Sequence, residues 1–231
     1  MGERIQFETN GHQTEGYLAR PAAPGPGVIV IQEWWGLVPH IEQVADRFAA
    51  AGFVALAPDL YHGARATSPD EAGKLMMSLR VDQAAADLDG AVRVLQRQPE
   101  TLSGQVGTIG FCMGGALSLF AASRNPHVGA CVVFYGIHPN ISPDLPALAA
   151  PVLGIYAEQD ALVTASAIGA LDAQLSALGK RHTFHTYPGT RHAFFNDTRP
   201  EVYDESAATD AWQKTLAFLR EELPRGAGRP A

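Results

Sequence analysis

A cysteine between glycines, in the segment Gly-Phe-Cys-Met-Gly-Gly at residues 110–115, is the feature of this sequence best suited to do chemistry. An ionised thiol is a strong nucleophile. The segment follows an apolar run at 106–109 and precedes a small-residue run at 116–122, which predicts a sharp strand-to-helix turn. Glycines on either side of Cys112 suit such a turn because strand and helix approach closely there. The pattern predicts a nucleophile elbow, and the alternative interpretation of Cys112 is a small buried core thiol.

A nucleophilic thiol needs a base, and the base needs a group that orients it. His192 lies in the loop after the last predicted strand, where its side chain can reach the strand ends. Asp160 follows the preceding predicted strand and can accept a hydrogen bond from the second imidazole nitrogen. Cys112, Asp160 and His192 thus occur in the chain order nucleophile, acid, base of α/β-hydrolases. Glu158 and Asp59 remain alternatives for the acid.

A second unusual segment, Gln-Glu-Trp-Trp-Gly at 32–36, follows the β-branched run 28–31. In this architecture the loop supplies one backbone N–H of an oxyanion hole, and the residue after the nucleophile supplies the other. Those residues are Trp34 and Met113. Glu33 is expected to face the same cavity, where its carboxylate could accept a hydrogen bond from the Cys112 thiol and keep it neutral at rest; the alternative is a surface charge.

The surrounding pattern predicts an α/β fold. Apolar runs predict eight strands, at residues 5–9, 16–20, 28–31, 53–57, 106–109, 130–135, 152–156 and 182–187. Helical periodicity of apolar residues marks helices within 41–49, 81–95, 168–178 and 212–223. We therefore expect a mostly parallel eight-stranded sheet with helices on both faces. An N-terminal antiparallel hairpin with a six-residue loop at 10–15 opens it.

The length suits a single α/β domain over 1–223, followed by a tail at 224–231 that we expect to be disordered. The net charge of −7 and the lack of a basic cluster argue against nucleic acid as a partner. Nothing predicts a membrane span, a signal segment or a metal-ligand spacing, so we expect a cytoplasmic protein, monomeric or homodimeric, without cofactor or metal. Cys131, inside an apolar run, is expected to be a reduced core thiol.

These motifs, together with Ala-Pro-Asp-Leu-Tyr at 57–61 and Arg-His-Ala-Phe at 191–194, resemble the dienelactone hydrolase family of the α/β-hydrolase superfamily. The resemblance runs from about residue 5 to about residue 222. It implies a Cys112, His192, Asp160 triad with Glu33 coupled to the thiol. It also implies hydrolysis of a small ester or lactone through an acyl-thioester intermediate.

One position departs from the family. Its best-known members hold the carboxylate of their substrate with arginines, one of them four residues after the catalytic histidine, where this chain has Asn196. An amide cannot reproduce the bidentate grip of Arg on a carboxylate, which counts against dienelactone itself as the substrate. The residues expected to contact a small apolar or aromatic ester are Trp35, Tyr61, Tyr135, Phe194 and Arg80. Residues 62–78 are expected to form a loop and short helix above the site, either a lid or a plain connection.

Two other functions remain possible from the sequence. A cysteine amidase or glutaminase also uses a Gly-X-Cys-X-Gly elbow, but such glutaminases place Glu two residues after His, where this chain has Phe194. A non-catalytic or redox-sensing protein could keep the fold and the reactive thiol. The complete nucleophile, base and acid set favours the ester or lactone hydrolase.

Overall fold

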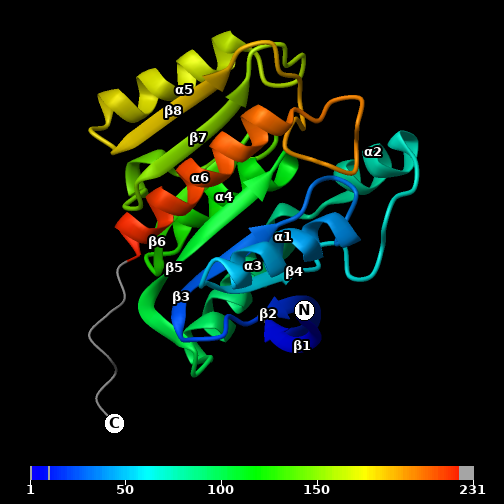
Figure 1. The fold of residues 1–231 in the computed structure, drawn as a ribbon, viewed down its shortest axis with the longest axis vertical. Helices are drawn as coiled ribbons and strands as arrows, with labels where there is room; N and C mark the ends of the chain where they lie inside the picture. Colours follow the sequence, from blue (N-terminus) through cyan, green and yellow to red (C-terminus); the bar gives the residue numbers. More distant parts are fainter. Residues whose placement is uncertain (1, 10, 224–231) are drawn as a thin grey trace.

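One mixed sheet of eight strands organises the molecule (Figure 1). The computed structural model describes residues 2–9 and 11–223. The strand order across the sheet is β1-β2-β4-β3-β5-β6-β7-β8. The strands are β1 (Glu3–Thr9), β2 (His12–Ala19), β3 (Gly25–Ile31), β4 (Val54–Pro58), β5 (Thr101–Phe111), β6 (Val128–Phe134), β7 (Val152–Ala157) and β8 (His182–Tyr187). All pairings from β4 to β8 are parallel, whereas β1–β2 and β2–β4 are antiparallel. The predicted fold class is confirmed.

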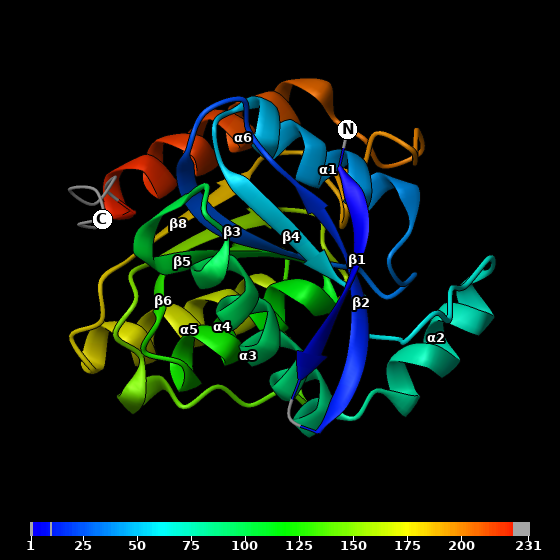
Figure 2. The same cartoon turned by 90° about the horizontal axis from the view of Figure 1, so that it is seen from below.

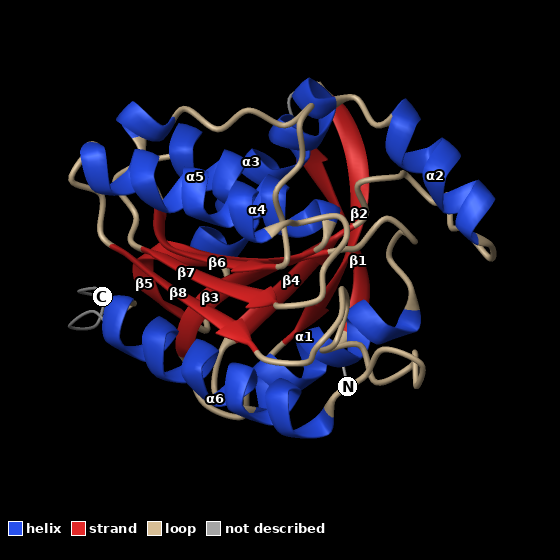
Figure 3. Ribbon diagram, turned by 90° about the horizontal axis from the view of Figure 1, so that it is seen from above, coloured by secondary structure: helices blue, strands red, loops and turns tan. Residues whose placement is uncertain are grey.

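Helices cover both faces of the sheet, as Figure 3 shows. Helices α1 and α6 pack on one face, and α3, α4 and α5 pack on the other. The helices are α1 (Pro39–Ala50), α2 (Pro69–Ser78), α3 (Val81–Arg97), α4 (Met113–Arg124), α5 (Ala165–Ala177) and α6 (Glu205–Glu222), with a 3₁₀ turn at Leu145–Ala147. Every residue of β3 is buried, because helices cover both faces of the sheet. This explains why the strand contains no polar side chain.

The predicted N-terminal hairpin is confirmed, but the prediction of a six-residue loop at 10–15 is wrong. Strand β2 begins at His12, which pairs with Thr9 of β1. The polar run from His12 to Glu15 concealed the start of the strand, because β1 is the sheet edge and part of this ribbon faces water. Figure 2 shows β1 and β2 as a long ribbon at one side of the sheet. His12 is the first residue of β2 and does not belong to a loop.

The loop and short helix predicted at 62–78 are present, and the helix is α2. Figures 2 and 3 show α2 set off from the layers of the sheet and the other helices. The tail at 224–231 lies outside the described residues. Within the described chain, none of the helices combines the length and apolarity that crossing a bilayer requires.

Candidate active site

Cys112 lies at the turn between β5 and α4 with φ 56° and ψ −120°. This is a backbone conformation that non-glycine residues rarely adopt, and such strain concentrates at functional sites. The flanking glycines permit it. A Cβ on Gly110 would overlap the backbone of Gly114, and a Cβ on Gly114 would lie 2.5 Å from the Ile31 carbonyl oxygen. The Cys112 N–H donates to the Phe134 carbonyl at 3.0 Å, which anchors the turn to β6.

His192 and Asp160 are brought together from loops that follow neighbouring strands. The distance from His192 Nδ1 to Asp160 Oδ2 is 2.6 Å. The other oxygen of Asp160 accepts hydrogen bonds from the backbone N–H groups of Leu162 at 2.8 Å and Val163 at 3.0 Å. The carboxylate is thus fixed on both oxygens. Glu158 is exposed and accepts a hydrogen bond from the Gly189 N–H instead.

The electrostatics of the pair follow from burial and contact. Burial lowers the pKa of His192, but the hydrogen bond with Asp160 and the nearby Cys112 thiol outweigh it and raise the pKa to about 10. Burial raises the pKa of Asp160, whereas its hydrogen bonds with His192 and the backbone hold it below its ordinary range. His192 Nε2 is buried without a hydrogen-bond partner among the described residues, so it is free to exchange a proton.

Glu33 is buried at the end of β3 and lines the same cavity as Cys112. The donor to Glu33 Oε2 is Asn196 Nδ2, at 2.8 Å. Asn196 is itself fixed, because its Oδ1 accepts hydrogen bonds from the Thr198 N–H at 3.1 Å and the Thr198 hydroxyl at 2.6 Å. The position that departs from the family therefore contacts Glu33 through a neutral amide.

Trp34 and Met113, the residues expected to supply an oxyanion hole, both have backbone N–H groups near the turn that carries Cys112. Met113 is the first residue of α4, so its N–H has no partner within the helix. Neither N–H donates to another backbone group among the loop and cap hydrogen bonds of residues 2–9 and 11–223. Both residues line the cavity beside Cys112.

The cavity at this site has a volume of about 540 Å³. The predicted residues that line it are Glu33, Trp34, Cys112, Met113, Tyr135 and His192. Asp160 lies behind His192, as an orienting group does. The Tyr135 hydroxyl is buried without a hydrogen-bond partner in the described chain. It is therefore available to a bound molecule.

Four residues expected to contact substrate lie elsewhere. Trp35, Tyr61, Phe194 and Arg80 do not line this cavity. Phe194 is fully buried against Tyr135 and Tyr187, and the Tyr61 hydroxyl contacts Met113 Sδ at 3.3 Å. Tyr61 and Arg80 line a separate, smaller hollow.

Sequence reasoning did not assign several residues that do line the cavity. Arg191 and Arg199 come from the loop after β8, Met76 from α2, and His138 from the loop after β6. Arg191 adjoins His192, so its neighbourhood was visible in the sequence. The position of Arg199 depends on the path of an irregular loop and carries no motif.

The second cysteine behaves as predicted. Cys131 is fully buried on β6, and both cysteines are free. Burial raises the pKa of Cys131 to about 11. At neutral pH the Cys131 thiol is therefore un-ionised. Cys112 is the thiol that lines the cavity, and the buried Cys131 serves as an internal control for thiol modification.

The sheet order, the strained cysteine at the β5–α4 turn and the histidine–aspartate pair at the strand ends define an α/β-hydrolase. The profile of the dienelactone hydrolase family matches residues 14–223. The chain belongs to that family and is a dienelactone-hydrolase-like hydrolase.

Individual relatives agree along nearly the whole chain. "Protein usf" of Aquifex pyrophilus is 40% identical over 230 residues, covering 96% of this chain and 100% of the relative. A "Putative carboxymethylenebutenolidase" of Aquifex aeolicus is 34% identical with the same coverage. The crystal structure of a "Putative Dienelactone Hydrolase" from Klebsiella pneumoniae has a TM-score of 0.87 and 30% identity, covering 96% of this chain and 98% of its own.

Proposed function

We propose that the protein hydrolyses a small carboxylic ester or lactone with Cys112 as nucleophile, His192 as base and Asp160 as the orienting acid. The observation that carries the proposal is the hydrogen bond of 2.6 Å that holds His192 Nδ1 on a buried carboxylate, beside a cavity that the elbow cysteine lines. A carboxylate on Nδ1 fixes the tautomer, so Nε2 is the atom that exchanges protons. Cys112 is among the groups that raise the pKa of His192, and it does so by charge only as the thiolate, so the raised pKa describes His192 holding the proton after the thiol has given it up.

The reaction then has two halves. Cys112 Sγ forms a bond to the carbonyl carbon while its proton passes to His192 Nε2. The C–O bond of the ester or lactone breaks, and His192 protonates the leaving oxygen. Water next attacks the acyl thioester as His192 takes a proton from it, the S–C bond breaks, and His192 returns the proton to Sγ to restore the thiol. The N–H groups of Trp34 and Met113 stabilise the oxyanion in both halves, each by a few kcal/mol.

Glu33 is proposed to have the opposite effect to His192: its carboxylate disfavours the thiolate and so keeps the resting Cys112 thiol neutral. Its support is its burial on the same cavity as Cys112. The Asn196 amide occupies one carboxylate oxygen and adds no positive charge. The negative charge of Glu33 is thus left uncompensated by this neighbour, which disfavours a second anion at Cys112.

The cavity favours a compact substrate with an acidic group. Its wall is apolar around Tyr135, Ile137 and Val163, and its cationic side chains are Arg191 and Arg199. A guanidinium can bind a carboxylate with two hydrogen bonds. We propose that these two arginines take the part of the family arginine that is absent at Asn196, although Arg199 also pairs with Glu201 at 2.7 Å. The relatives named as carboxymethylenebutenolidases support a lactone that bears a carboxylate.

The deciding experiment follows p-nitrophenyl acetate turnover before and after iodoacetamide, with the site of alkylation mapped by mass spectrometry. We expect modification of Cys112 but not of the buried Cys131, and loss of turnover in proportion to it. Cys112→Ala should abolish turnover with the fold intact, and Cys112→Ser should reduce it sharply. Glu33→Gln should shift the pH profile. Turnover that survives Cys112→Ala would refute the nucleophile, and an unchanged profile in Glu33→Gln would remove the role of Glu33.

A further inference from the structure

A second cluster of reactive side chains lies outside the catalytic cavity, around Asp87 of α3. His12, at the start of β2, places Nε2 2.9 Å from Asp87 Oδ1. His62, in the loop after β4, places Nε2 3.1 Å from Asp87 Oδ2. The two imidazole rings meet edge to face with centroids 5.7 Å apart. Three segments far apart in the sequence therefore converge on one carboxylate.

The carboxylate of Asp87 is fully buried, and this burial sets the chemistry of the cluster. A buried carboxylate is costly unless a positive charge or several hydrogen bonds compensate it. Oδ2 has no properly aligned hydrogen bond within the described chain, although His62 Nε2 lies near it. The charged partners of Asp87 in the described residues are these two histidines alone, which carry charge only when protonated. A cation between the three groups would satisfy the carboxylate at neutral pH.

The geometry fits a small transition-metal ion. The ligand atoms of His12, His62 and Asp87 all lie within 4.8 Å of one another. Tetrahedral zinc with bonds of about 2.0–2.1 Å separates its ligand atoms by about 3.3 Å, so small movements suffice. Two imidazoles favour zinc and similar ions over calcium and magnesium, which prefer oxygen. The His12 and His62 side chains are 32% and 38% exposed, which leaves an entry path and a fourth position for water.

Groups around the histidines support this role. The Thr14 hydroxyl lies 3.3 Å from His62 Nδ1, the ring nitrogen that does not face Asp87. Histidines that bind metals commonly hydrogen-bond through the second ring nitrogen, which fixes the ring. His12 Nε2 also contacts Gln83 and the Thr9 hydroxyl, the latter at 2.7 Å, and a metal would displace these contacts.

We propose that His12, His62 and Asp87 form a site for one divalent transition-metal ion, zinc by preference, with water as fourth ligand. The ion would tie the β1–β2 hairpin and the loop after β4 to α3. The same loop leads into α2, whose Met76 lines the catalytic cavity. The site is separate from the residues proposed to carry out hydrolysis, because none of its three ligands lines the catalytic cavity.

The test is binding of Zn²⁺ and Co²⁺ to protein stripped by a chelator, in a Cys112→Ala background so that the catalytic thiol cannot bind the ion. Calorimetry should give one Zn²⁺ per chain, a raised Tm and proton release. Co²⁺ should give visible bands typical of tetrahedral nitrogen and oxygen ligands, without thiolate charge transfer. His12→Gln and His62→Gln should each weaken Zn²⁺ binding by at least ~10-fold.

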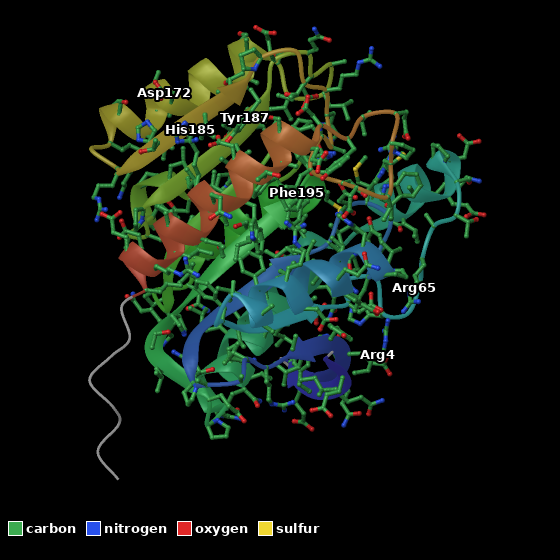
Figure 4. All side chains as sticks on the ribbon, viewed as in Figure 1. Arg4, Arg65, Asp172, His185, Tyr187 and Phe195 are labelled. Atoms are coloured by element: carbon green, nitrogen blue, oxygen red, sulfur yellow. The ribbon has the colours of Figure 1, made fainter. Side chains whose placement is uncertain are left out.

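The matched control is His182→Gln. His182 Nε2 also contacts a carboxylate, Asp172 Oδ1 at 3.1 Å, but no second histidine joins that pair. Figure 4 shows Asp172 on α5, at the opposite end of the molecule from Arg4 on β1. His182→Gln should leave Zn²⁺ binding unchanged. Each variant must match the metal-free parent in circular dichroism and urea unfolding, and the two exposed histidines provide independent tests. Absence of stoichiometric binding, or binding that persists when both His12 and His62 are replaced, would overturn the proposal.

Discussion

The hydrogen bond between Asp160 and His192 can be tested by replacing Asp160 with Asn, which keeps the shape and removes the charge. The ordinary pKa of His192, near 6.5, rises to about 10 in the folded protein. This difference corresponds to about 5 kcal/mol of stabilisation of the imidazolium, supplied by Asp160 and Cys112 together against the opposing effect of burial. In Asp160→Asn the burial remains while the main opposing group is lost. The pKa of His192 should therefore fall.

The effect is isolated by comparing Cys112→Ala with the double variant Cys112→Ala, Asp160→Asn, because neither contains the catalytic thiol. NMR titration of the His192 ring in each gives the pKa directly. A fall in the double variant is expected. An equal pKa in the two proteins would refute the assignment of Asp160 as the group that holds the proton on His192.

Stability should change with pH in the same experiment. In the Cys112→Ala protein Asp160 still raises the pKa of His192, so this contribution is fully present below the unfolded-state pKa of about 6.5 and is lost as the pH rises through the folded-state pKa that the NMR titration gives. The free energy of unfolding of the Cys112→Ala protein should therefore decline across that interval. The decline should be smaller in the double variant, as measured by urea unfolding at several pH values. In the enzyme with Cys112 present, Asp160→Asn should reduce kcat by ~10²- to 10⁴-fold because the tautomer is no longer fixed.

Three further predictions concern the cavity and the elbow. Tyr135→Phe should reduce kcat/KM about 2- to 10-fold, because its buried hydroxyl has no partner in the described chain and can donate a hydrogen bond to substrate. Tyr156→Phe removes a similar hydroxyl away from the cavity and should leave kcat/KM unchanged. Equal kinetics in the two variants would contradict the role of Tyr135. Arg199→Gln should raise the KM for a lactone with a carboxylate at least ~10-fold and leave the KM for p-nitrophenyl acetate unchanged. Arg220→Gln on α6, away from the cavity, is the control. Equal losses on both substrates would count against carboxylate binding. Gly114→Ala should lower the free energy of unfolding by at least ~2 kcal/mol in urea, because the added Cβ meets the backbone of β3. Gly73→Ala on α2 places its Cβ in open space and should stabilise the protein slightly. Similar effects of the two substitutions would refute the steric argument.

The parts of the site that the sequence predicts are those that local rules determine. The elbow follows from glycine spacing around Cys112, since a strand and a helix that meet at one residue exclude Cβ atoms nearby. Asp160 and His192 follow from their places just after parallel strands, whose carboxyl ends share one edge of the sheet. These positions required no knowledge of the loops beyond their starting points.

The remaining parts depend on how irregular segments fold back. Arg199 reaches the cavity through a loop whose path is set by hydrogen bonds of Asn196 and Thr198, which no short motif announces. Arg80 has the right charge but belongs to the turn before α3, beside a different hollow. The sequence does not reveal the start of β2 because residues 12–15 pair only with the edge strand β1, and such a ribbon needs no continuous apolar pattern. The sequence therefore predicts His12 in a turn, away from Asp87.

The loop after β8 brings catalysis and specificity into one segment. It carries His192, the proposed base, and then Asn196, whose amide donates a hydrogen bond to Glu33. It also carries Arg191 and Arg199, the cations on the cavity wall. A family arginine at 196 would place its positive charge directly against Glu33. With Asn there, Glu33 is spared that charge, while Arg191 and Arg199 line the cavity from other positions of the same loop. The substitution at 196 thus separates control of the thiol from binding of the acid group, two tasks that an arginine at this position would combine.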